Sequence, residues 1–112
     1  MEKHSHPDIE QDATRIIGEL FQALPDTAKA FGGLQQATFQ DGALDVKTKE
    51  FIALGIAIAQ SCDGCMAWHN AALSRLGASI EEIAETCGVA VEMGGGIALY
   101  SAAKTLAGYK EF

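Results

Sequence analysis

Two cysteines and a histidine near the middle of the chain form its clearest chemical pattern. Cys62 and Cys65 are three positions apart, and His69 follows four positions after Cys65. In a helix that begins near Ser61 or Cys62, a rotation of about 100° per residue places Cys65 roughly 60° from Cys62, with His69 between them. The three side chains therefore share one narrow helix face, which indicates thiol chemistry or a metal site.

The same spacing allows a disulfide to form and open reversibly. A cysteine in the first turn of a helix lies near exposed backbone amides and the positive end of the helix dipole, and both stabilise a thiolate. His69, one turn after Cys65, is placed to accept or relay a proton from that thiol. Glu50 stands at the head of an apolar run, where a partly buried carboxylate suits a proton acceptor near neutral pH.

Other roles fit the same residues. Cys62, Cys65 and His69 could bind zinc, although the sequence offers no second CxxC or HxxxH to supply the fourth ligand. The two cysteines could instead be packing residues. Glu50 could be an acid in the first helical turn that only complements the helix dipole.

The remaining cysteine and histidines are expected to have no part in this chemistry. Cys87 lies on an apolar stripe with Ile80 and Ile83, which favours a small core residue. His4 and His6 fall in an N-terminal tail, residues 1–8, that we expect to be disordered and to bind metal only weakly.

The composition favours one small cytoplasmic domain. The chain has 112 residues, 48% of them apolar, which is enough for one compact core. Three cysteines are an odd number for a disulfide scaffold, and a CxxC in the cytosol is more often redox or metal-binding than structural. The net charge of −7, with scattered basic residues, argues against nucleic acid and anionic membranes as partners. The polar N-terminus and the short apolar runs argue against a signal peptide and a membrane span.

Hydrophobic periodicity predicts an all-α domain of about six helices within residues 9–112. Pro25 separates the first two helices, and Asp45 is the expected N-cap of the third. Ser79 and Glu82 form a capping box for the fifth helix. Three consecutive glycines at 94–96 separate it from the last. The expected helices therefore span about 9–24, 25–39, 46–60, 62–77, 80–93 and 97–109.

The third of these helices is apolar on nearly every side. After Glu50 it contains only apolar residues and glycine from Phe51 to Ala59. A helix with no polar face is buried all round. A domain this small has few other elements to cover it, so we expect a second chain to cover one face.

Short motifs extend the pattern over most of the chain. They are Lys49-Glu50, Cys62-x-x-Cys65-x-x-x-His69, Ala71-Ala72, Gly77-Ala78-Ser79, Met93-Gly94-Gly95-Gly96 and Tyr100. As a set, covering roughly residues 31–110, they resemble the AhpD-like alkylhydroperoxidase core of the carboxymuconolactone decarboxylase family. The resemblance implies an all-helical bundle that assembles into homo-oligomers, either trimers or hexamers built from dimers.

The resemblance also implies roles for individual residues. Cys65 matches the thiol that attacks a peroxide, and Cys62 matches the more exposed partner that closes the disulfide. His69 and Glu50 match a proton relay for the attacking thiol. The best-studied members carry a second histidine directly before the second cysteine, and here that position is Gly64.

The chain is therefore expected to be a thiol-dependent hydroperoxide reductase or disulfide oxidoreductase. Its partners would be a small peroxide and an external dithiol protein that reduces the disulfide, with no metal or organic cofactor. One alternative is a lactone enzyme of the decarboxylase type, but that branch of the family generally lacks the cysteine pair. The other alternative is a non-enzymatic protein that binds metal through cysteine and histidine.

Overall fold

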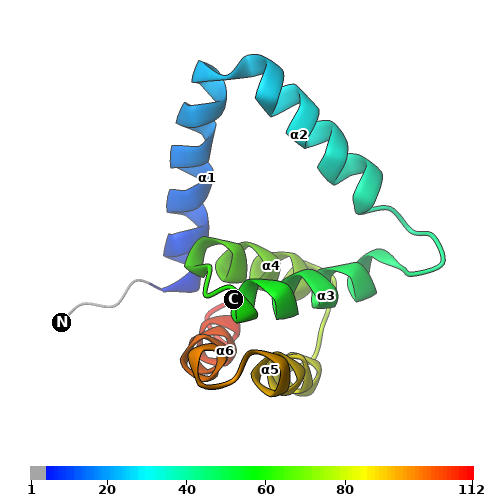
Figure 1. The fold of residues 1–112 in the computed structure, drawn as a ribbon, viewed down its shortest axis with the longest axis vertical. Helices are drawn as coiled ribbons and strands as arrows, with labels where there is room; N and C mark the ends of the chain where they lie inside the picture. Colours follow the sequence, from blue (N-terminus) through cyan, green and yellow to red (C-terminus); the bar gives the residue numbers. More distant parts are fainter. Residues whose placement is uncertain (1–4) are drawn as a thin grey trace.

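The computed structural model describes residues 5–112, which form six α-helices joined by short loops (Figure 1). The helices are α1 His6–Ala23, α2 Pro25–Thr38, α3 Val46–Ala59, α4 Asp63–Arg75, α5 Ile80–Gly94 and α6 Gly96–Tyr109. The described part of the chain contains no strand. The predicted all-α fold of about six helices is confirmed, and most helix boundaries fall within one or two residues of those expected.

The predicted capping residues stabilise the N-terminal ends of α3 and α5. The Asp45 carboxylate accepts the backbone N–H of Thr48 at 2.7 Å, which satisfies one of the free donors of the first turn of α3. Ser79 Oγ accepts the Glu82 N–H at 3.1 Å, and Glu82 accepts the Ser79 N–H at 2.8 Å in return. Gly95, at φ +69°, separates α5 from α6 in a conformation that favours glycine.

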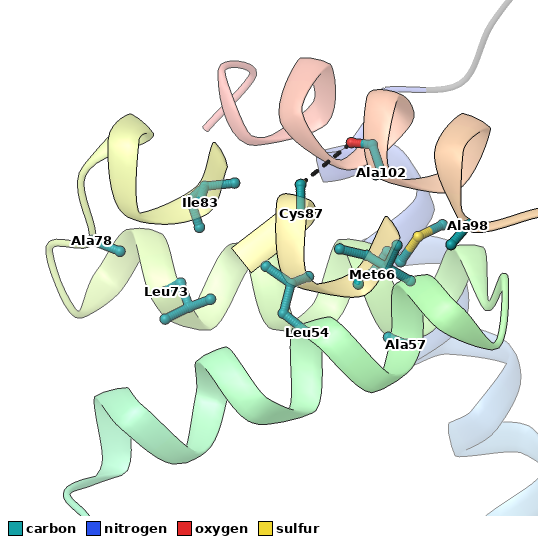
Figure 2. Packing of buried hydrophobic residues seen from close by; sticks show 11 residues of the cluster. Leu54, Ala57, Met66, Leu73, Ala78, Ile83, Cys87, Ala98 and Ala102 are labelled. Atoms are coloured by element: carbon teal, nitrogen blue, oxygen red, sulfur yellow. Dashed lines mark hydrogen bonds between the residues drawn. The ribbon is translucent and has the colours of Figure 1, made fainter. Parts of the chain in front are cut away.

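Helices α3 to α6 enclose the hydrophobic core, and α3 packs against the other three. Leu54, Met66, Leu73 and Ile83 are fully buried, and their side chains converge from α3, α4 and α5 (Figure 2). Several alanines lie among them and allow the helices to approach closely. This core fixes α4 against α3, and these two helices carry the predicted site residues.

Helices α1 and α2 form an arm that extends away from this core (Figure 1). Among the helices, α2 packs only against α1, and α1 packs against α4 and α6. The apolar side chains of Ile16, Leu20, Phe31 and Leu34 on these two helices are between 46% and 61% exposed. Within one chain, no helix covers these apolar side chains of the arm.

Helix α1 begins earlier than expected, within the predicted tail of residues 1–8. Ser5 Oγ caps the helix by accepting the Asp8 N–H at 3.2 Å, and His6 is 95% buried rather than part of a disordered tail. The His6 backbone N–H donates to Glu111 at 2.9 Å. Asn70 Nδ2 donates to His6 Nδ1 at 2.9 Å, and burial lowers the pKa of the imidazole. Residues 1–4, including His4, lie outside the described part.

Gly108 on α6 makes this burial of His6 possible. A Cβ added at Gly108 would collide with the imidazole ring of His6. Because Gly108 has no side chain, the beginning of α1 can pack closely beside the end of α6.

Replacing Gly108 with alanine should lower the free energy of unfolding by about 1–3 kcal/mol, because the new methyl group displaces the His6 ring. Urea denaturation at a fixed protein concentration measures the change. Gly88→Ala is the matched control, because Gly88 lies on the exposed face of α5 and a Cβ there meets nothing within 4 Å. This control should gain about 0.5–1 kcal/mol from helix propensity. Equal effects of the two substitutions would contradict the proposed packing role.

Candidate functional site

Cys62 lies in the turn where α3 ends and α4 begins. The Ser61 N–H donates to Ile58 O at 3.0 Å, and the Cys62 N–H donates to Ala57 O at 3.1 Å. These two bonds form the Schellman ending of a helix. Cys62 is also the N-cap of α4, and its Sγ accepts the Cys65 N–H at 3.2 Å. One residue therefore terminates one helix and caps the next.

Cys62 and Cys65 are joined by a disulfide, with their Cα atoms 5.2 Å apart. Cys65 is exposed and Cys62 is partly buried, which is the reverse of the exposure expected from the family pattern. The turn between two helices partly encloses Cys62, whereas Cys65 lies on the outer side of α4. Gly64, between them, is partly buried beside α1, and a Cβ there would lie 3.6 Å from that of Ala13.

Glu50 and His69 are in direct contact. His69 Nδ1 lies 2.6 Å from Glu50 Oε1, and Glu50 is 91% buried. The contact forms because α4 folds back along α3, which brings the residue one turn beyond Cys65 beside a residue about three turns before the end of α3. With Glu50 ionised, Nδ1 of His69 carries a hydrogen and donates it, which leaves Nε2 free to accept a proton.

Phe39 also belongs to this site. Its ring stacks on the imidazole of His69, with the ring centroids 6.2 Å apart and the planes at 26°. Lys49 holds the segment in place, because its Nζ donates to Thr38 O at 2.9 Å and to Gln40 O at 2.6 Å. No local pattern indicates this contact, which joins residues 30 positions apart in the printed sequence.

Cys87 is separate from the cysteine pair, as predicted. Its Sγ donates to Ala102 O at 3.5 Å in the core (Figure 2). Burial raises the pKa of this thiol, so it is a poor source of thiolate.

Residues 5–112 contain no group of three or more histidine, cysteine or acidic side chains placed to hold a metal ion. No helix within the same residues is long and apolar enough to cross a membrane.

The chain belongs to the carboxymuconolactone decarboxylase family, whose model matches residues 25–107. An uncharacterised protein of Cupriavidus necator is 38% identical over 96 residues, covering 86% of this chain and 85% of its own. An uncharacterised protein encoded in the cox locus of Paracoccus denitrificans is 39% identical over 95 residues, covering 85% and 86%.

Solved structures of the family share the whole fold. A carboxymuconolactone decarboxylase family protein from Legionella pneumophila superposes with a TM-score of 0.91 at 42% identity, covering 96% of each chain. A family protein from Thermotoga maritima gives a TM-score of 0.81 at 31% identity, covering 91% of this chain and 87% of its own. The latter is described as having a possible part in an antioxidative response.

Mild oxidation of the reduced protein should remove two hydrogens from the peptide that contains Cys62 and Cys65 and leave Cys87 a free thiol. Mass spectrometry after proteolysis locates the bond. A thiol-alkylating reagent should modify Cys87 slowly in the folded protein and quickly after denaturation, because burial removes access and raises its pKa. A disulfide that includes Cys87 would contradict the assignment.

Proposed function

We propose that this protein is a thiol-dependent hydroperoxide reductase that also acts as a disulfide oxidoreductase toward its reductant. The observation that carries the proposal is the 2.6 Å contact between Glu50 on α3 and His69 on α4. The cysteine pair lies at the beginning of the same helix α4. A CxxC alone fits several roles. A histidine oriented by a buried carboxylate one turn after the second cysteine fits a proton acceptor for that thiol.

In the proposed cycle His69 accepts the proton of Cys65, and the thiolate attacks the outer oxygen of a hydroperoxide. The O–O bond breaks, Cys65 becomes a sulfenic acid, and the alkoxide takes a proton to leave as an alcohol. The thiol of Cys62 then attacks the sulfur of Cys65, forming the disulfide and releasing water. An external dithiol protein returns two electrons and two protons, and its own thiols become a disulfide.

Each residue of the site supports one step of this cycle. The exposure of Cys65 gives a peroxide access to the attacking sulfur. The Cys65 N–H, 3.2 Å from Cys62 Sγ, stabilises negative charge on Cys62 when the disulfide opens. Phe39 covers one face of His69 and limits the orientations of its ring. The possible antioxidative part ascribed to the Thermotoga maritima protein agrees with this assignment.

A peroxide titration of the reduced protein tests the function directly. One equivalent of cumene hydroperoxide should consume two thiols per chain and yield one equivalent of cumyl alcohol, with no metal added. The Cys65→Ser variant should reduce cumene hydroperoxide far more slowly than the wild type. If the thiols of the well-folded wild-type protein survive an excess of peroxide, the proposed activity is wrong.

Glu50→Gln and His69→Ala should each slow the alkylation of Cys65 by iodoacetamide at neutral pH by about ten- to a hundredfold. The double variant should lose less than the product of the two factors, because both residues act on one proton path. Glu85→Gln on α5 is the control, and it should react like the wild type. An unchanged rate in folded Glu50→Gln would leave Glu50 as an ordinary helix-start acid.

We further propose that the chain works as a homo-oligomer, with α3 at the interface. Ile52 and Ile56 on α3 are 49% and 52% exposed, and Val89 and Met93 on α5 are 66% and 77% exposed. Together they line an apolar groove of about 420 Å³ between the two helices. Such a continuous apolar surface, added to the uncovered stripes of α1 and α2, is typical of a subunit interface.

Light scattering at micromolar concentration should give three or six times the chain mass of 11.8 kDa. Ile56→Glu should reduce that mass, because it places a charge in the apolar interface. Gln11→Glu, on the exposed polar face of α1, should leave it unchanged. A wild-type mass near that of one chain would refute the proposed assembly.

A further inference from the structure

Ser61, directly before Cys62, has an unfavourable backbone conformation. Its φ is +55°, and among the described residues no other non-glycine residue has a positive φ. The left-handed position after a helix is usually filled by glycine, because a Cβ there is crowded by the backbone. A serine that keeps this conformation needs an interaction to hold it, and here the strain lies at the entry to the cysteine pair.

Two backbone hydrogen bonds of the turn already favour this conformation, and α6 adds a side-chain contact. Ser101, which is 97% buried, donates its hydroxyl to Ser61 Oγ at 3.0 Å. On the other side of Cys62, Lys104 Nζ lies 2.8 Å from Asp63 Oδ1. Helix α6 therefore binds both neighbours of Cys62, the first through a partly buried hydrogen bond between hydroxyl groups and the second through a partly exposed ion pair.

We propose that the Ser61–Ser101 hydroxyl pair positions Cys62 for disulfide formation. The pair holds Ser61 in the left-handed conformation, which keeps Cys62 Sγ at the N-cap of α4, where the Cys65 N–H donates to it. Cys62 then loses little conformational freedom when the disulfide closes, so the pair shifts the thiol–disulfide equilibrium toward the disulfide. Its relevance to catalysis rests on the proposed function, but the equilibrium is measured without peroxide.

Equilibration of the protein with dithiothreitol at fixed pH tests this role. The disulfide takes two electrons and two protons from the reagent, which becomes a cyclic disulfide. Ser101→Ala should shift the equilibrium about tenfold toward the dithiol, or about 30 mV in midpoint potential. Ser61→Gly should shift the equilibrium in the same direction, because it also removes the hydroxyl contact. Since glycine suits this backbone position, the stability of this variant to urea should not fall. The double variant should shift no further, since both changes remove one contact.

Ser79→Ala is the matched control, because it removes a serine cap on α5 away from the cysteines. It should lower the stability to urea and leave the dithiothreitol equilibrium unchanged. Equilibria within twofold of the wild type in both Ser101→Ala and Ser61→Gly would overturn the proposal, as would an equal shift in Ser79→Ala. If the shifts occur but peroxide oxidises no thiols, the proposed function fails while the positioning role stands.

Discussion

The reversal of the chain at Ser61 and Cys62 is the constraint on which the rest of the site depends. It folds α4 back along α3, and only this antiparallel packing brings His69 to the buried carboxylate of Glu50. The same turn places Cys62 at the beginning of α4, where its sulfur meets a backbone N–H. The cysteine pair and the Glu50–His69 contact are thus arranged by a single helix connection, and α6 contacts this connection through the Ser101 hydroxyl.

The two parts of the molecule serve this arrangement differently. Helices α3 to α6 supply a packed core that fixes the positions of the cysteines and of Glu50. The α1–α2 arm contributes at its two ends, where α1 packs beside Gly64 and the segment after α2 places Phe39 on His69. Between those ends its apolar side chains remain uncovered. Because so much apolar surface of the arm is exposed in one chain, we expect other copies of the chain to cover it.

Local signals predicted most of the fold and the pairing of Cys62 with Cys65. Periodicity located the six helices, Asp45 and Ser79 marked two of their starts, and spacing grouped Cys62, Cys65 and His69. The buried position of His6 was not predicted, because it depends on contacts with Asn70, Gly108 and Glu111, which lie far along the chain. The strained turn was missed because glycine, not Ser61, is the usual signal for it. The exposure of the α1–α2 arm was not predicted, because an apolar helix face does not indicate whether the same chain or another chain covers it.

In the proposed cycle Cys65 attacks the peroxide after Glu50 and His69 remove its proton, and Cys62 then resolves the sulfenic acid. Trapping the sulfenic acid with dimedone in two single-cysteine variants tests this order most directly. After one equivalent of peroxide, Cys62→Ser should carry one dimedone adduct on Cys65, and Cys65→Ser should carry none on Cys62. An adduct on Cys62 in Cys65→Ser, with Cys65 unlabelled in Cys62→Ser, would contradict the account.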